Sequence, residues 1–200
     1  MRPPDHRLCV YCGSASGGRP EYVQAAKSLG LAMARNNIGL VYGGGSIGLM
    51  GETARAVLAA GGHVTGIIPD FLVNKERMQE GVQELIVTSN MHERKMAMFE
   101  RSSGFVALPG GIGTLDELAE ILTWAQLKQH ARPVILCNVE GFWNGLLDML
   151  NHMRNEGFIR SGFEVTMDVA EEPDAVIPAY HARRAMTRDI VGSEVVKDKL

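Results

Sequence analysis

Short apolar runs alternate with helical patterns along almost the whole 200-residue chain. The strand-like runs lie at 8–12, 38–42, 63–68, 84–88, 105–108, 133–137 and 165–169. Helical patterns cover 20–36, 47–60, 91–102, 115–130, 142–156 and 173–181, and segment 71–80 is ambiguous. Strands that alternate with helices favour a largely parallel sheet with helices on both faces. The alternation therefore predicts an α/β fold, a Rossmann-like three-layer sandwich with a mostly parallel sheet.

Size and charge narrow the domain count and the partners. Two hundred residues with 46% hydrophobic content suit one well-cored domain, so we expect a single domain over 1–182 and a polar C-terminal tail over 183–200. Twenty basic residues nearly balance 23 acidic ones without a basic stripe, which predicts no nucleic-acid or membrane partner. With no leader-like or spanning apolar stretch, we expect a cytoplasmic protein.

The first apolar run contains a C-x-x-C pair, Cys9 and Cys12. Such a pair can form a redox or metal site. On a strand, however, residues three apart point to opposite faces. We therefore predict two core thiols.

A glycine-rich segment, Pro109–Glu117 (PGGIGTLDE), follows one apolar run and opens a helical pattern. Glycines leave backbone N–H groups bare, and the helix adds the positive end of its dipole, so this loop suits a phosphate. Glu117, placed in the first turn, would then lie beside whatever the phosphate carries. A capping box formed by Thr114 and Glu117 is an alternative reading of the same spacing. The two roles are compatible, and both stay open.

A second glycine loop, Gly43-x-Gly45-x-x-Gly48, matches the dinucleotide fingerprint, with Asp70 at a suitable distance for a ribose contact. It follows the second expected strand rather than the first, and the loop at 110–113 competes for the same phosphate. An NAD site and a purely structural tight turn both remain possible from spacing alone.

Arg94 and Lys95 fall in the first turns of an expected helix, where cations oppose the helix dipole. Either they are solvated surface charges, or another group compensates them.

The PGGIGTLDE segment resembles the PGGxGTxxE signature of the Lonely Guy (LOG) family, the cytokinin riboside 5'-monophosphate phosphoribohydrolases. Three further segments are similar to LOG segments in the same order: Tyr42–Gly51 (YGGGSIGLMG), Met91–Lys95 (MHERK) and Thr123–Gln126 (TWAQ). The similarity runs from about residue 8 to about residue 180.

This resemblance implies an enzyme that hydrolyses the N-glycosidic bond of cytokinin riboside 5'-monophosphates, and of AMP, to free base and ribose 5-phosphate. Arg94 and Glu117 would be the catalytic pair. The resemblance also implies a homodimer whose only other partner is a small nucleoside monophosphate, with no metal or other cofactor. The implied substrate-binding residues are Gly43, Gly44, Gly45, Glu76, Met91, Arg94, Lys95, Gly110, Gly111, Ile112, Gly113, Thr114, Glu117 and Thr123.

Two other classes stay open, a non-catalytic nucleotide-binding protein and an NAD-dependent oxidoreductase. Relatives also carry the label lysine decarboxylase. That reaction needs a Schiff-base lysine, and the only lysine near a motif is Lys95, already placed beside the phosphate loop.

Overall fold

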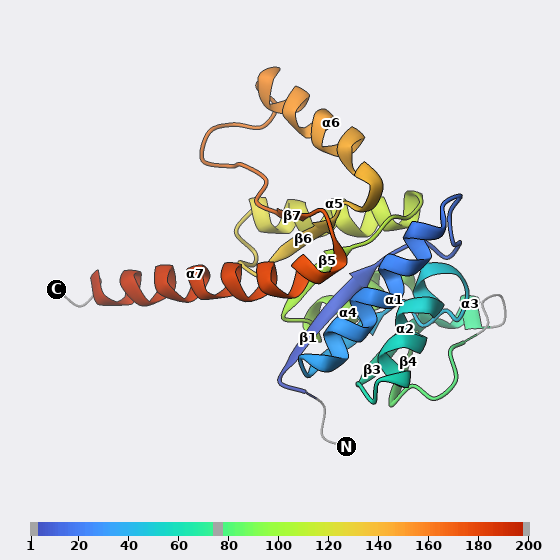
Figure 1. Cartoon of the computed structure of the whole chain (residues 1–200). Helices are drawn as coiled ribbons and strands as arrows, with labels where there is room; N and C mark the ends of the chain where they lie inside the picture. Colours follow the sequence, from blue (N-terminus) through green and yellow to red (C-terminus); the bar gives the residue numbers. More distant parts are fainter. Residues whose placement is uncertain (1–3, 74–77, 198–200) are drawn as a thin grey trace.

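The chain forms one seven-stranded parallel sheet in this computed structural model, which describes residues 4–73 and 78–197, with side chains as far as Thr187. The strands are β1 (His6–Tyr11), β2 (Ile38–Tyr42), β3 (Val64–Pro69), β4 (Glu84–Thr88), β5 (Gly104–Ala107), β6 (Val134–Cys137) and β7 (Asp168–Ala170). Their order in the sheet is β4-β3-β2-β1-β5-β6-β7 (Figure 1).

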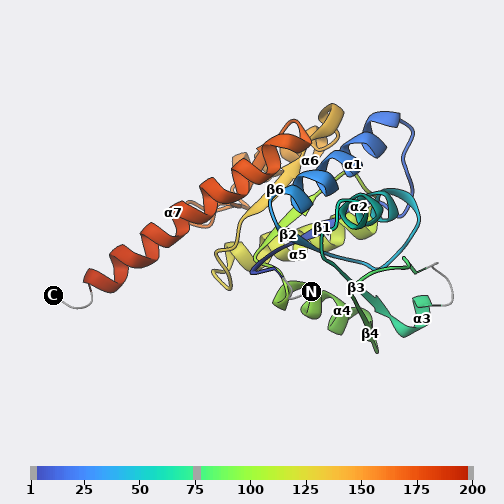
Figure 2. The same ribbon diagram turned by 60° about the horizontal axis from the view of Figure 1, so that its bottom comes forward.

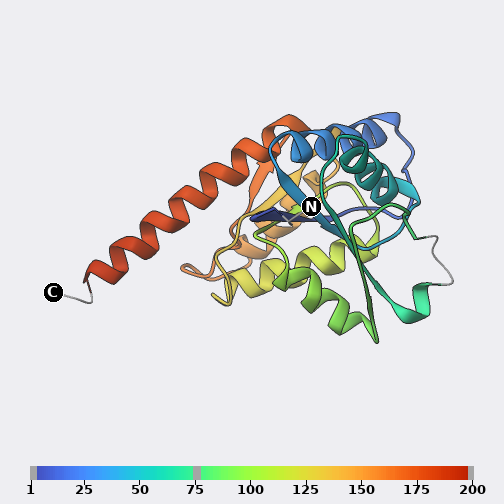
Figure 3. The same cartoon turned by 90° about the horizontal axis from the view of Figure 1, so that it is seen from below.

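Helices cover both faces of the sheet. The helices are α1 (Pro20–Arg35), α2 (Gly48–Ala59), α3 (Asp70–Val73), α4 (Met91–Glu100), α5 (Ile112–Gln126), α6 (Asn144–Asn155) and α7 (Val176–Lys197), with single 3-10 turns at Val139–Gly141 and Pro173–Ala175. Helices α1, α2 and the start of α7 pack on one face, whereas α4 and α5 pack on the other (Figure 3). The predicted three-layer α/β architecture is confirmed.

Successive side chains of the central strand β1 point to opposite faces of the sheet and so contribute to the hydrophobic core on each face. Leu8 and Val10 of β1 face α1 and α2, whereas Cys9 and Tyr11 face α4 and α5. Cys9 and Cys12 are free and buried in different cores, as their spacing predicted. Burial raises the pKa of both thiols, so they stay neutral.

Three loops meet at the carboxyl edge of the sheet. The strand order reverses between β1 and β5, the kind of position at which open α/β sheets bind ligands. The amide of Gly13, just after β1, donates to the Pro109 carbonyl over 3.0 Å. The Gly13 carbonyl accepts from Leu49, the second residue of α2, over 3.1 Å. Gly48 lies against the Ser14 backbone with φ of +61°, a position where no side chain would fit.

The C-terminal helix is longer than the sequence pattern indicated. We expected a helix over 173–181 and a loosely attached tail from Arg183, but α7 continues to Lys197 and extends away from the sheet (Figures 1 and 2). Polar residues without an apolar stripe gave no helical signal there. The guanidinium of Arg183 pairs with Asp168 of β7, and Arg184 contacts His6 of β1.

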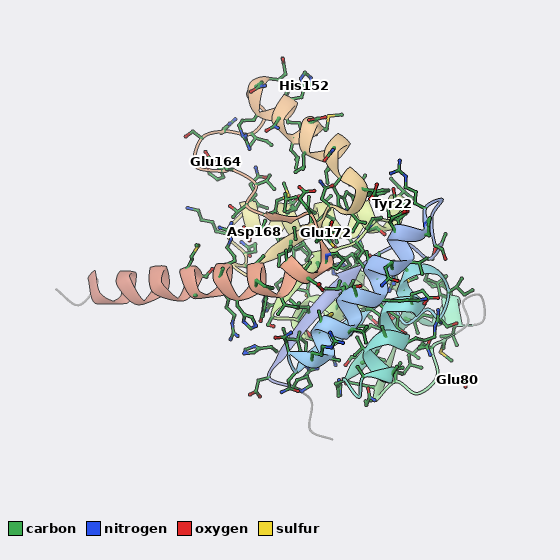
Figure 4. All side chains as sticks on the ribbon, in the orientation of Figure 1. Tyr22, Glu80, His152, Glu164, Asp168 and Glu172 are labelled. Atoms are coloured by element: carbon green, nitrogen blue, oxygen red, sulfur yellow. The ribbon has the colours of Figure 1, made fainter. Side chains whose placement is uncertain are left out.

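Helix α6 reaches outward from the fold, with His152 close to its outer end (Figure 4). The ambiguous segment 71–80 contains the short α3, and its described end returns to the second glycine loop, where Met78 pairs with Gly45 in an antiparallel bridge. None of the described helices combines the length and apolar character needed to cross a bilayer.

Candidate active site

Helix α5 begins earlier than the sequence pattern suggested. Gly111 is its N-cap residue, and no side chain in the described part of the chain caps it. Thr114 is therefore the third helical residue, and Glu117 lies in the second turn. The alternative interpretation of Thr114 and Glu117 as a capping box is wrong, because the two glycines at 110 and 111 let the chain enter the helix before Thr114. The Thr114 side chain instead packs against Gly110, in space that any side chain there would fill.

The start of α5 faces open space. No described atom lies within 4 Å of where a Cβ atom of Gly111 or Gly113 would stand, and Ile112 is 82% exposed. The first amides of a helix have no carbonyl partner within that helix, and the dipole makes this end positive. The site thus presents several N–H donors to an anion such as a phosphate.

Helix α4 turns Arg94 inward. Asn90 caps this helix by accepting from the Glu93 amide over 2.9 Å, and the Glu93 carboxylate accepts from the Ser89 amide over 3.0 Å. One residue later, the Arg94 Nε atom donates to the Ile67 carbonyl of β3 over 3.1 Å. Arg94 is buried, so it is not the solvated surface charge that the sequence left open.

Arg94 and Glu117 form a buried ion pair. Their Nη1 and Oε1 atoms are 3.5 Å apart, and the two side chains are only 10% and 11% exposed. Gly43 makes room for this arrangement, because a Cβ atom there would overlap the Arg94 guanidinium. The second glycine loop therefore contributes to the site because Gly43 has no side chain and leaves space for the Arg94 guanidinium.

The Glu117 carboxyl titrates close to neutral pH. Burial raises its pKa to about 7, repulsion from Asp116 and Glu120 adds to the increase, and attraction to Arg94 and Lys95 opposes it. A carboxyl group with such a pKa populates both its charged and its neutral form near pH 7, which suits a group that accepts and returns a proton.

Lys95 lies beside this pair but binds other carboxylates. Its Nζ atom is 2.7 Å from Asp116 Oδ2 and 3.4 Å from Glu120 Oε2. Partial burial alone would lower the pKa of Lys95, but these two carboxylates outweigh burial and raise it. Sequence reasoning had not singled out Asp116 and Glu120; their spacing of one helical turn beside Glu117 was the available signal.

The second glycine loop lies at the same edge of the sheet. Gly44 adopts a φ of +83°, and its carbonyl accepts from the Gln79 amide over 3.2 Å. The next residue, Gly45, forms the bridge with Met78. Segment 78–79 thus lines one side of this loop.

The remaining substrate-binding candidates from the sequence lie at different places in the structure. Met91, the first residue of α4, places its sulfur 3.9 Å from Arg94 Nη1. Thr123 is exposed on α5 and donates to the Ala119 carbonyl over 2.7 Å, so the structure does not bring it to Glu117. Glu76 lies outside the described residues.

Fold and site together define the class of protein: a Rossmann-like α/β protein with an open, uncapped helix start beside a buried carboxylate–guanidinium pair. A family model described as "Possible lysine decarboxylase" matches residues 50–180. Cytokinin riboside 5'-monophosphate phosphoribohydrolase LOG1 of Arabidopsis thaliana is 50% identical over 153 residues, which is 76% of this chain and 72% of that protein. The probable enzyme LOGL9 of Oryza sativa subsp. japonica is 52% identical over 153 residues, covering 76% and 67% of the two chains. The chain belongs to this LOG family of phosphoribohydrolases, as its motifs indicated.

Solved structures share the fold at lower identity. The Moco carrier protein from Chlamydomonas reinhardtii is 23% identical with a TM-score of 0.67, covering 90% of this chain and 98% of that one. A molybdenum cofactor binding protein from Rippkaea orientalis is also 23% identical, with a TM-score of 0.62 and coverage of 96% and 99%. These similarities show a common architecture.

Proposed function

We propose that the protein hydrolyses the N-glycosidic bond of cytokinin riboside 5'-monophosphates, and of AMP, to free base and ribose 5-phosphate. The supporting observation is the position of the buried Arg94–Glu117 pair one turn along α5 from the open amides at its start. A phosphate held by those amides places its ribose next to the carboxyl group.

The chemistry follows from charge. Breaking the bond from C1' to the base nitrogen leaves an oxocarbenium-like ribosyl centre, and an ionised Glu117 stabilises that positive charge. The same carboxylate takes a proton from the water that attacks C1'. The electron pair of the broken bond goes to the base nitrogen, which takes a proton from solvent, and Glu117 then returns its proton to solvent. Arg94 holds the carboxylate in place and supplies a positive charge beside the second glycine loop for the ribosyl phosphate.

An NAD-dependent reaction has less support. In a dinucleotide site, the glycine loop lets the pyrophosphate approach its backbone. Here the Arg94 guanidinium occupies the space against Gly43, and the fingerprint follows β2 rather than the first strand.

Lysine decarboxylation also has little support, although the matching family model carries that description. A Schiff-base lysine must lose its proton before it attacks a carbonyl group. Two carboxylates hold the Lys95 ammonium and raise its pKa, which favours the unreactive protonated form.

Incubation with nucleotides tests the proposal. Chromatography should show free base released from AMP and isopentenyladenosine monophosphate but not from the matching nucleosides, because the α5 amides require a phosphate. Equal turnover of adenosine and AMP would contradict the role given to the helix start. A larger thermal shift with NAD than with AMP would favour the oxidoreductase, and AMP binding without hydrolysis would favour a non-catalytic binding protein.

We also infer a homodimer in the cytoplasm, with helices flanking the glycine loops in the contact. Exposed apolar side chains at both ends of α5, Ile112 and Leu127, support such a contact. Three buried free thiols support a reducing compartment. Light scattering at micromolar concentration should give twice the chain mass, and a monomer would contradict the dimer.

A further inference from the structure

Two neighbouring cations of α4 bind different carboxylates of α5. Arg94 pairs with Glu117 in the buried layer, where both side chains are about one-tenth exposed. Lys95 pairs with Asp116 and Glu120 in a more exposed layer, where the two carboxylates are 59% and 26% exposed. Each cation thus has its own acidic partners.

We propose that Asp116 and Glu120 are positioning residues that hold the Lys95 ammonium away from Glu117, so that among the described residues Glu117 has Arg94 as its only direct ion-pair partner. The inference rests on the proposed function in one respect, the role of Glu117 as the reacting carboxyl group. The contacts themselves do not depend on that role.

The geometry of α5 explains why two carboxylates share one lysine. Asp116 and Glu120 are four residues apart, so their side chains lie one above the other on the same helix face. An ammonium has three donors and can bind both carboxylates at once. Glu117 is rotated by about 100° from Asp116 around the helix, toward the core. This rotation separates the inner pair from the outer group.

The rest of the helix pair supports the same alignment. Farther along, the rings of Phe99 on α4 and Trp124 on α5 meet edge to face, with centroids 5.1 Å apart. Figures 2 and 3 show the two helices on the same face of the sheet. The aromatic contact fixes one end of the pair, and the Lys95 contacts fix the end beside the glycine loop.

The arrangement affects the charge on Glu117. The charged groups around it are Arg94 and Lys95 on α4 and Asp116 and Glu120 on α5. Beneath it, β1 and the residue that follows this strand supply Cys9, Tyr11 and Cys12, whose pKa values burial raises, so they remain neutral. A Lys95 freed from its carboxylates could turn toward Glu117 and favour the ionised form.

Titration of Glu117 tests the proposal without depending on activity. In protein labelled with ¹³C at glutamate carboxyls, the double variant Asp116→Asn/Glu120→Gln should lower the pKa of Glu117 by about 0.5 or more. Direct loss of two negative charges also lowers it, so the experiment is repeated in a Lys95→Met background. If the two carboxylates act on Glu117 through Lys95, the decrease in the pKa of Glu117 should be smaller by about half or more in the Lys95→Met background. An equal decrease in both backgrounds would overturn the proposal.

Chemical labelling of Lys95 provides a second readout. Acetylation followed by mass spectrometry should show Lys95 reacting slowly in the wild type and several-fold faster in the double variant, relative to Lys128. The conservative variant Asp116→Glu should keep slow labelling, and Glu100→Gln, an exposed carboxylate of α4, is the matched charge control. Unchanged labelling in the double variant would overturn the proposal. If the double variant does not fold, Glu120→Gln alone is tested in its place, and unchanged labelling of Lys95 in that variant would likewise overturn the proposal.

Activity separates this inference from the proposed function. With AMP as substrate, the double variant should lose roughly tenfold in kcat/KM, because a Lys95 ammonium turned toward Glu117 would compete with Arg94 for the carboxylate and draw it out of position. A wild-type protein that releases no base would contradict the proposed function. The titration and labelling results would still decide the role of Asp116 and Glu120.

Discussion

The Arg94 guanidinium lies 3.5 Å from the Glu117 carboxylate at a point where two helices approach the end of the sheet. A buried ion pair loses the hydration of both charges, and this cost often exceeds the attraction between them. The pKa of Glu117, raised to about 7, shows that burial outweighs the attraction to Arg94. The pair is therefore better explained by chemistry than by stability.

Replacing the carboxylate should abolish most turnover. Glu117→Gln keeps the size of the side chain and a hydrogen-bond acceptor for Arg94, but it cannot take a proton from water or stabilise a ribosyl cation. We expect the rate of base release from AMP to fall by roughly 10²- to 10⁴-fold. A wild-type rate in a steady-state assay would show that Glu117 is not the catalyst.

The same substitution should alter how stability depends on pH. The folded pKa of about 7 exceeds the unfolded value of 4.5, so the folded protein binds more protons between these limits. The stabilisation is complete below pH 4.5 and is lost as the pH rises through 7. Glu117→Gln removes this dependence, so its melting temperature relative to the wild type should rise from pH 5 to pH 8. The full difference corresponds to about 3 kcal/mol. A constant difference across this range would contradict the raised pKa.

Changing the shape of the cation should also reduce turnover. Lysine has one ammonium and cannot reach both the Ile67 carbonyl and Glu117, as the Arg94 guanidinium does. For Arg94→Lys we expect the rate to fall by roughly 10²-fold. The exposed Arg35→Lys is the control and should retain the wild-type rate. Arg94→Met should raise the pKa of Glu117 still further, visible as a shift of the pH–rate profile to higher pH.

A single methyl group on the second glycine loop should disturb the pair. Gly43→Ala places a Cβ atom where the Arg94 guanidinium lies, so the guanidinium must move. A displacement of about 1 Å at such a site costs roughly 10²-fold in rate. Gly145→Ala, where the added methyl meets no described atom within 4 Å, is the matched control. Equal activity of the two variants would remove Gly43 from the site.

Sequence patterns predicted the architecture better than the details of the site. The parallel sheet followed from buried apolar runs, because such strands have a strong local signal, and β2 (Ile38–Tyr42) and β4 (Glu84–Thr88) have the expected bounds. The predicted start of α5 was wrong because Thr114 resembled an N-cap residue, whereas the helix begins at Ile112 with Gly111 as its N-cap. Helix propensity is a property of side chains, whereas Gly110 and Gly111 set the start of the helix through their backbone freedom.

Other features depended on contacts between distant segments. Arg94 is buried because Ile67, on another strand, offers a carbonyl, and nothing in the sequence near Arg94 records this. Lys95 was assigned to the substrate by resemblance, and its partners on α5 became visible only when the two helices were placed together. Thr123 matched a motif, yet it faces solvent because it is rotated around α5 away from Glu117.

Gly13 accepts a hydrogen bond from the start of α2 through its carbonyl and donates one to the loop before α5 through its amide, so this one residue joins three segments. Displacing any one of these segments breaks at least one hydrogen bond at Gly13, which couples their local opening. The three segments at this edge of the sheet should therefore open together rather than separately. The amides of Gly13 and Leu49 should accordingly exchange with solvent deuterium at similar, slow rates.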